Sequence, residues 1–502
     1  MLKKIILLIL ISINIAFRIN SFSFSNSEIK NLKHWVNIEE KSIKSVVKVI
    51  NYYNKFNWLK PYKSFDDEIF YGTGFFINNS GHILTNYHVI EDASEVKINI
   101  PSISNKLLKV TIVSIYPELD IALLKLANSG KIFLTKKLNK IEYLKLGNSD
   151  KIKSGEPVIT LGYPLNSTNL ISTSGIIGTP KIGTDIQFSA PISRGNSGGP
   201  LINLKGEVIG INTRINGNGQ NTNFAIQINT AKKNLNYLKK QNVLNLANSG
   251  FETILVHDDF IKYFEYPIEG GCFIHKVHDE GLAKKIGIKK GYLITEINGN
   301  KIDKACNVWI KGFDHPINLF DYTKGLEFGQ NVNLVAYKRN KKKIINFKLE
   351  PEEDNKIHRV YTEINNEKID YEIFGGLVLM NLTLNHVDLL SQNINDLNKY
   401  YYPENQQEPA VIITNVFQNS PASKRYMYPG LVINTINEIE IKTLEDLKEV
   451  FENINIDSNL RILTKDNCFF IMPVKKILKH ENNLFLKYKY NKSKLFDLIK
   501  TK

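Results

Sequence analysis

A six-residue turn, Gly195-Asn196-Ser197-Gly198-Gly199-Pro200, is the most constraining feature of this chain. Glycines flank the serine on both sides, so the backbone can turn sharply, expose the hydroxyl and aim neighbouring N–H groups at one point. An exposed nucleophile and donors for a developing oxyanion are what acyl transfer requires of a serine. Most turns of this composition are ordinary loops, so the interpretation depends on partners elsewhere in the chain.

Two upstream segments supply such partners. His88 follows the strand-like run Gly81-His82-Ile83-Leu84-Thr85, and Asp120 opens the apolar run Ile121–Leu126. The chain order His, Asp, Ser is that of the chymotrypsin-like double β-barrel and differs from the orders in subtilisin and the α/β-hydrolases. We therefore predict Ser197 as the nucleophile, His88 as the general base and Asp120 as the carboxylate that orients the imidazole.

These segments resemble the HtrA/Deg family of serine endopeptidases, from about Ser45 to about Ile228, and the C-terminal half looks most like the plant-type Deg branch. Two further runs carry the resemblance, Leu146-Gly147-Asn148-Ser149-Asp150 and Leu161-Gly162-Tyr163-Pro164. The resemblance implies oxyanion donors at the backbone N–H groups of Gly195 and Ser197. It also implies an ATP-independent endopeptidase that degrades unfolded or misfolded proteins, and homo-oligomers built on trimers.

The serine turn departs from the family pattern directly before Gly195. Many members carry Asn-Pro there, whereas this chain has Ser193-Arg194. Proline would fix φ near −65° and help to hold the loop, but Arg194 leaves the backbone freer and adds a cation. The sequence alone therefore does not predict a preformed oxyanion site.

The residues about six positions before the nucleophile suggest which side chain the enzyme would accept at the cleavage site. Pro191 stands at the base of the predicted S1 pocket, with Ala190 and Ile192 beside it. A trypsin-like pocket needs an acidic residue here to pair with a substrate Lys or Arg, and this stretch has none. We expect cleavage after small or medium aliphatic residues.

The fold expected from the pattern is mainly β. With 502 residues, the chain is too long for one core. Short β-branched and aromatic runs broken by Gly, Asn, Asp and Pro predict a pair of β-barrels, followed by two α+β domains that resemble PDZ domains. The expected segments are a signal peptide (1–25), a protease domain (41–240), a first PDZ-like domain (246–350), a linker (351–366), a second PDZ-like domain (367–480, with an insertion at 381–409) and a C-terminal tail (481–502).

PDZ domains bind chain ends by adding a strand to a sheet edge while loop N–H groups hold the terminal carboxylate. In the second domain we expect that loop at Phe374-Gly375-Gly376-Leu377. In the first domain it would lie near Gly250-Phe251, where the match is loose. The expected partners are therefore unfolded polypeptides at the protease domain and peptide C-termini at the PDZ-like domains.

The N-terminus reads as a secretory signal, with Lys3-Lys4 before an apolar run from Ile5 to about Phe17. We expect a location outside the cytoplasm, either periplasmic or in the secretory pathway; an uncleaved segment would instead anchor the chain. The formal net charge of +15 comes mostly from lysines spread over the whole chain, so we expect no specific nucleic-acid binding.

Three cysteines, Cys272, Cys306 and Cys468, form no disulfide framework by count or spacing. Cys272 and Cys306 fall in one expected domain and could pair, but we favour buried thiols. No spacing resembles a zinc site, and no nucleotide motif such as a P-loop occurs, so we expect neither a metal nor a cofactor. The rival hypotheses are a catalytically weak scaffold or chaperone that binds peptides through its PDZ domains, and a trypsin-like processing protease.

Overall fold

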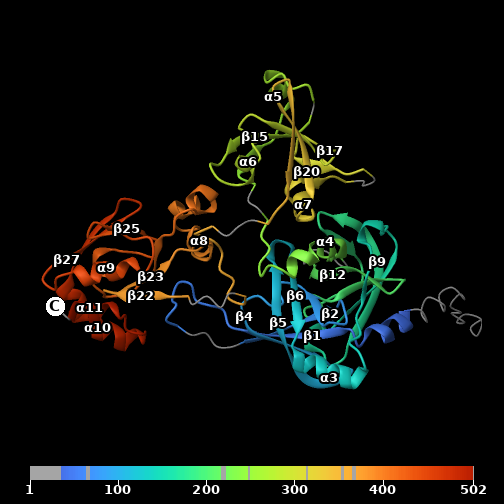
Figure 1. Ribbon diagram of the computed structural model, residues 1–502, viewed down its shortest axis with the longest axis horizontal. Coiled ribbons are helices and arrows are strands. Elements are labelled where there is room, and N and C mark those ends of the chain that lie inside the picture. The colour runs from blue at the N-terminus through green and yellow to red at the C-terminus, as the bar shows by residue number, and fades with distance from the viewer. Residues whose placement is uncertain are drawn as a thin grey trace, which may run out of the picture.

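The computed structural model describes residues 35–63, 68–215, 222–246, 249–268, 270–311, 315–351, 355–364 and 369–500. The expected signal peptide lies outside these residues. The described chain is mainly β, and Figure 1 shows it as three bodies, the N-terminal half and two C-terminal domains. Each C-terminal domain contacts the N-terminal half, the first through Phe328 on Tyr116 and the second through Phe417 on Tyr62. Within this part of the chain, no helix is long and apolar enough to cross a membrane.

The first barrel closes in the strand order β1-β2-β3-β6-β5-β4, with neighbouring strands antiparallel. From Val96 to Ile100 every other residue of β4 is buried, which is the period of a strand with one face toward a barrel interior. Helix α3 (Asn128–Leu138) follows the last strand. The strands are β1 (Val46–Tyr53), β2 (Glu68–Phe76), β3 (His82–Thr85), β4 (Ala93–Ile100), β5 (Ser104–Tyr116) and β6 (Ile121–Leu126).

The second barrel closes because β11 pairs with β12 as well as with β8, giving the cycle β11-β8-β9-β10-β13-β12. Strand β7 (Lys145–Leu146) joins β12 from outside, and helix α4 (Ile228–Leu238) ends this half of the chain. Its strands are β8 (Pro157–Gly162), β9 (Ile171–Ile182), β10 (Asp185–Phe188), β11 (Pro200–Asn203), β12 (Glu207–Ile215) and β13 (Asn223–Gln227). The two barrels confirm the predicted fold class.

The first C-terminal domain holds one eight-stranded sheet and three short helices, α5 (Asp258–Tyr263), α6 (Leu282–Lys285) and α7 (Leu319–Lys324). A disulfide joins Cys272 and Cys306 here, so the preference for buried thiols was wrong. The two residues lie 34 apart in sequence, and only the fold brings their Cα atoms to 4.8 Å. The strands are β14 (Phe251–Ile254), β15 (Cys272–Val277), β16 (Leu293–Ile297), β17 (Asn300–Ile302), β18 (Asn307–Trp309), β19 (Ile317–Asn318), β20 (Asn331–Lys338) and β21 (Lys341–Lys348).

The second C-terminal domain has a seven-stranded sheet in the order β22-β23-β24-β25-β27-β28, with β26 on β25. The strands are β22 (Tyr371–Phe374), β23 (Leu377–Asn381), β24 (Val411–Val416), β25 (Val432–Ile436), β26 (Ile439–Glu440), β27 (Asn459–Thr464) and β28 (Phe469–Pro473). Its helices are α8 (Leu384–Leu390), α9 (Asp446–Asn453), α10 (Val474–Tyr488) and α11 (Leu495–Lys500).

The second domain extends beyond its expected boundary at residue 480. Leu495, Phe496 and Ile499 of α11 are buried in the same apolar cluster as the sheet and α9, so the expected tail is part of the domain. The insertion at 381–409 is also packed: its helix α8 and the short helical turn at Asn395–Tyr401 share a core with β24 and β25, and Pro403 of the turn Pro403–Asn405 is buried.

Candidate active site

His88 and Asp120 of the first barrel meet through two hydrogen bonds. The Nδ1 atom of His88 lies 2.8 Å from Oδ2 of Asp120 and 3.0 Å from Oδ1, and the His88 backbone N–H donates to Oδ1 at 2.9 Å. His88 lies just after β3, and Asp120 ends the turn Pro117–Leu119 in a left-handed conformation with φ of 54°. The carboxylate at Nδ1 favours the tautomer protonated there, which leaves Nε2 free to accept a proton.

The surroundings of His88 set its basicity. Burial alone would lower the pKa of His88, but the hydrogen bond and charge of Asp120, together with the charge of Glu91, raise it above the usual value for histidine. Asp120 also accepts a hydrogen bond from Thr213 Oγ1 at 2.6 Å, on β12 of the second barrel. The side chain of Asp120 is 28% exposed, so this carboxylate is only partly enclosed.

Ser197 lies in the loop between β10 and β11 of the second barrel. Gly198 has a φ of +83°, and a Cβ there would stand 2.1 Å from the Thr73 carbonyl oxygen, so only glycine fits. The Ser197 hydroxyl donates to the Thr213 carbonyl at 3.2 Å. Among the described residues it makes no hydrogen bond to His88, so it must rotate away from Thr213 before it can give its proton to Nε2.

Within the turn Gly195–Gly199, the N–H groups of Gly195 and Ser197 have no acceptors among the described residues. The neighbouring N–H groups of Asn196, Gly198 and Gly199 all donate within the protein. Such a pair of unused donors beside a serine is the arrangement that an oxyanion would occupy.

Thr73 of the first barrel holds this loop from the other side. Its hydroxyl donates to the Gly195 carbonyl at 2.7 Å, and its backbone N–H donates to the Ser197 carbonyl at 2.8 Å. The same hydroxyl accepts from the Tyr163 backbone N–H at 3.0 Å. The two carbonyls are therefore anchored, while the N–H groups of Gly195 and Ser197 stay available.

The residues expected at the S1 pocket follow β10. Ala190 is fully buried, and its carbonyl accepts from Asn223 Nδ2 at 2.9 Å. Pro191 is exposed and its carbonyl accepts from Thr173 Oγ1 at 2.6 Å, whereas Ile192 packs against the core of the second barrel.

The residues expected to bind peptide in the second C-terminal domain occupy a tight β-hairpin. Gly375 and Gly376, with φ of +59° and +87°, connect β22 to β23, and Phe374 pairs with Leu377. Phe374 and Leu377 are fully buried in the domain core. All of β22 pairs with β23, so this edge of β23 is already occupied and is not free to accept a peptide strand.

The first C-terminal domain has an edge strand beside an apolar cavity. Strand β14 ends the sheet and pairs only with β15 within the described residues. An apolar cavity of about 110 Å³ extends from β14 to helix α7, with Phe251, Leu319 and Phe320 among its lining residues. This is the position near Gly250-Phe251 that the sequence matched only loosely.

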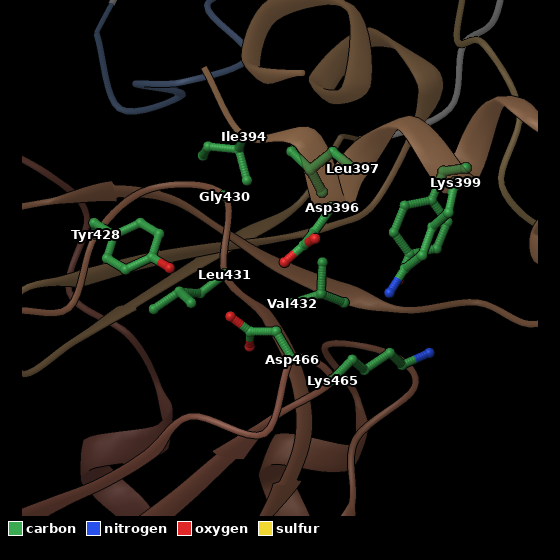
Figure 2. A pocket seen from close by; sticks show the side chains of 11 residues that line it. Ile394, Asp396, Leu397, Lys399, Tyr428, Gly430, Leu431, Val432, Lys465 and Asp466 are labelled. Carbon is green, nitrogen blue, oxygen red and sulfur yellow. The ribbon is translucent and has the colours of Figure 1, made fainter. Parts of the chain in front are cut away.

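A small cavity in the second C-terminal domain lies where the insertion meets β25 (Figure 2). Asp396 and Leu397 of the insertion face Tyr428 and Asp466 across it. Its volume of about 20 Å³ suits a single water molecule and not a peptide. Within the described residues, no group of three or more His, Cys, Asp or Glu could hold a metal ion.

Sequence reasoning missed Thr73 and Thr213. Thr73 lies in the run Gly72-Thr73-Gly74, and Thr213 follows the run Gly210-Ile211-Asn212. A hydroxyl between two glycines of a buried strand was a signal for a backbone-holding role, because it has no partner of its own within the strand.

The comparisons with known proteins agree with this architecture. Residues 72–211 match the trypsin-like peptidase domain, and residues 360–494 match the PDZ domain. A probable periplasmic serine endoprotease, DegP-like, of Pseudomonas fluorescens is 29% identical over 416 residues, which cover 80% of this chain and 78% of the relative. A DegP-like relative of Rickettsia conorii is 28% identical over 405 residues, which cover 78% of this chain and 74% of the relative.

Among solved structures, the HtrA-type protease AlgW with a tripeptide is 21% identical and covers 64% of this chain and 98% of its own, with a TM-score of 0.48. The sequence matches therefore carry the assignment. Together with the trypsin-like peptidase domain and the PDZ domain, they show that the chain is a serine endopeptidase that is similar to DegP-like endoproteases.

Proposed function

We propose that this chain cleaves unfolded or misfolded polypeptides outside the cytoplasm, without ATP, through an acyl-enzyme formed on Ser197. The observation that supports it most is the pairing of His88 with Asp120 beside a serine loop whose Gly195 and Ser197 N–H groups are unused by the described residues. The periplasmic DegP-like relatives support the extracytoplasmic location. An assembly built on trimers stays a prediction that sedimentation of the full chain would test.

The proposed reaction starts with rotation of the Ser197 hydroxyl toward His88. His88 Nε2 takes the proton while Oγ forms a bond to the scissile carbonyl carbon, and the oxyanion receives hydrogen bonds from Gly195 and Ser197 N–H. The imidazolium, stabilised by Asp120, then protonates the leaving amine as the C–N bond breaks. Water enters, gives its proton to His88 and releases the acyl group, which regenerates the serine.

We propose a preference for aliphatic residues before the cut. No acidic residue lies among Ala190, Pro191 and Ile192, and Ile192 adds apolar surface beside them. One methylene shifts such preferences by only about 1–3 kcal/mol, so cleavage should be broad. Mass spectrometry of cuts in denatured casein tests this; a majority of cuts after Lys or Arg would contradict it.

We further propose that peptide ends bind the first C-terminal domain along β14, because an apolar cavity adjoins that edge strand, whereas Phe374 to Leu377 form a closed hairpin whose apolar side chains are buried. This reassigns the peptide site from Phe374–Leu377 to the first domain. A scaffold without proteolysis would share this binding, so only a test of Ser197 separates the two hypotheses.

The test uses a rhodamine-linked fluorophosphonate and casein degradation with the full chain. Wild type should be labelled, whereas Ser197→Ala should not be labelled and should lose about 10³-fold or more of its hydrolysis. Ser193→Ala, in the same loop, is the matched control and should retain labelling. An unlabelled wild type, or casein cleavage by Ser197→Ala at the wild-type rate, would overturn the proposed function.

A further inference from the structure

The Arg194–Gly195 peptide is held although no proline precedes Gly195. The Arg194 carbonyl accepts a hydrogen bond from the Leu165 N–H at 2.7 Å. The C=O and N–H of a trans peptide point in opposite directions, so fixing the Arg194 carbonyl also fixes the Gly195 N–H. Leu165 therefore aims one of the two proposed oxyanion donors.

Leu165 holds this position in an unfavourable backbone conformation. Its φ is +48°, and Asn166 follows with +62°. A left-handed leucine costs about 1–2 kcal/mol. The Leu165 side chain is 78% exposed, so packing of this side chain does not hold the loop. Contacts from elsewhere must stabilise it.

Lys48 on β1 of the first barrel makes such contacts. Its Nζ donates to the carbonyl of Asn166 at 3.0 Å and to that of Ser167 at 3.3 Å. The same Nζ lies 4.8 Å from the centre of the Tyr71 ring. The hydrogen bonds reach across from one barrel to the loop that follows β8 of the other.

Lys48 is an unusual residue to bury. It is 7% exposed, and no carboxylate lies within ion-pair distance among the described residues. Burial lowers the pKa of its ammonium group, because an ammonium loses hydration there. A cation at this depth, with backbone carbonyls as its acceptors, is costly for stability alone, which points to a role for the carbonyls it holds.

We propose that Lys48 is a positioning residue for the oxyanion site, acting through the loop at 164–167 to fix the Arg194 carbonyl and so the direction of the Gly195 N–H. This connection replaces the restraint that proline at position 194 would supply. The inference rests on the proposed serine endopeptidase activity, in which Gly195 stabilises the oxyanion.

The first test compares Lys48→Met with Lys97→Met. Lys97 is a fair control because it lies on β4 of the same barrel with its Nζ 4.5 Å from the centre of the Tyr52 ring, but it pairs with Glu95. Loss of one whole oxyanion donor costs about 10²–10³ in kcat. We expect Lys48→Met, which only loosens that donor, to lower kcat and the fluorophosphonate labelling rate about tenfold to hundredfold.

Two readouts separate positioning from a general loss of structure. KM and the pH at which activity falls on acidification should stay as in wild type, because His88 and Asp120 are untouched. Lys48→Arg keeps a donor and should recover part of the rate. Labelling of Lys48→Met at the Lys97→Met rate would overturn the inference.

The second test changes Leu165, whose side chain is exposed, so that losing this side chain does not threaten folding. Leu165→Pro removes the N–H that holds Arg194 and cannot adopt a positive φ, whereas Leu165→Gly retains the N–H and accepts that φ. Leu165→Gly should label at least tenfold faster than Leu165→Pro. This pair decides the matter if Lys48→Met fails to fold, and equal rates for the two variants would overturn the inference.

Failure of the proposed function looks different from failure of this inference. An unlabelled wild type removes the proposed function itself. If the probe labels wild type but not Ser197→Ala, the proposed function stands. If it then also labels Lys48→Met and Leu165→Pro at the wild-type rate, the proposed role of Lys48 is wrong.

Discussion

Removing the Cys272–Cys306 disulfide should destabilise the first C-terminal domain and leave the catalytic loop intact. The bond closes a loop with a sequence separation of 34 residues. On the chain-entropy model, closing a loop of this length restricts the unfolded chain by about 4 kcal/mol at 25 °C. That is a large share of the stability of a domain of this size, which is of order 5–15 kcal/mol.

The assay is a urea titration of the full chain with pulsed hydrogen exchange, read by mass spectrometry on peptides from β16 and β20. With a slope of about 1–3 kcal/mol per molar, the double variant Cys272→Ala/Cys306→Ala should lower the midpoint of those peptides by about 1.3–4 M. Wild type in reductant should show the same lowered midpoint as the double variant. Cys468→Ala, which removes a free cysteine, should keep the wild-type midpoint. Midpoints within about 0.3 M of wild type would refute the reasoning.

Three further perturbations should have measurable effects. Since His88 acts as a base only when neutral and its pKa is raised, kcat/KM should fall as pH drops through a value above 6.5; a profile flat from pH 5 to 8 would contradict this. Thr213→Val removes a 2.6 Å hydrogen bond to Asp120 and should lower kcat about tenfold with little change in urea midpoint; unchanged kcat would count against its role. Burial raises the pKa of Glu481 to about 7, so its protonated form stabilises the second C-terminal domain below about pH 4.5 and that contribution is lost as pH rises through 7. Glu481→Gln should therefore flatten the difference in urea midpoint between pH 5 and pH 8, and an unchanged difference would refute the assignment.

The sequence predicted His88, Asp120 and Ser197 because each lies in its own short run beside a strand, where local pattern and chain order carry the information. In the structure His88 contacts Asp120. Thr213 makes hydrogen bonds to both other residues: its carbonyl accepts from the Ser197 hydroxyl, and its hydroxyl donates to Asp120. The double barrel was equally predictable, because its short strands are separated by strong turn residues.

The proposed peptide site was harder to predict, because a pair of glycines is compatible with two different local structures. Gly375 and Gly376 suit a carboxylate-binding loop and a two-residue hairpin equally, since both need positive φ. Pairing of β22 with β23 decides for the hairpin, and pairing is not visible in one local run. The prediction of buried thiols at Cys272 and Cys306 was wrong for a similar reason, since cysteines at this separation meet only through the fold.

The end of the second domain was missed although its signal was present. Val474, Ile477 and Leu484 recur on one face of α10 at helical spacing and are buried. The many lysines of this segment hid that period. Lys48 had a signal too, since a lysine within Val46-Val47-Lys48-Val49-Ile50 interrupts an otherwise apolar strand.

The proposed active site is assembled across the contact between the two barrels. The first barrel supplies His88 and Asp120, and the second supplies Ser197. Thr73 and Lys48 reach from the first barrel to backbone carbonyls around the serine loop, and Thr213 reaches back to Asp120. An apolar cluster that includes Phe75 and Leu161 also joins the two barrels, but these hydrogen bonds are short and directional, so a small shift between the barrels would misdirect the proposed oxyanion donors. Activity should therefore fail at lower urea concentration than the barrels unfold, and labelling lost only together with the barrel structure would contradict this view.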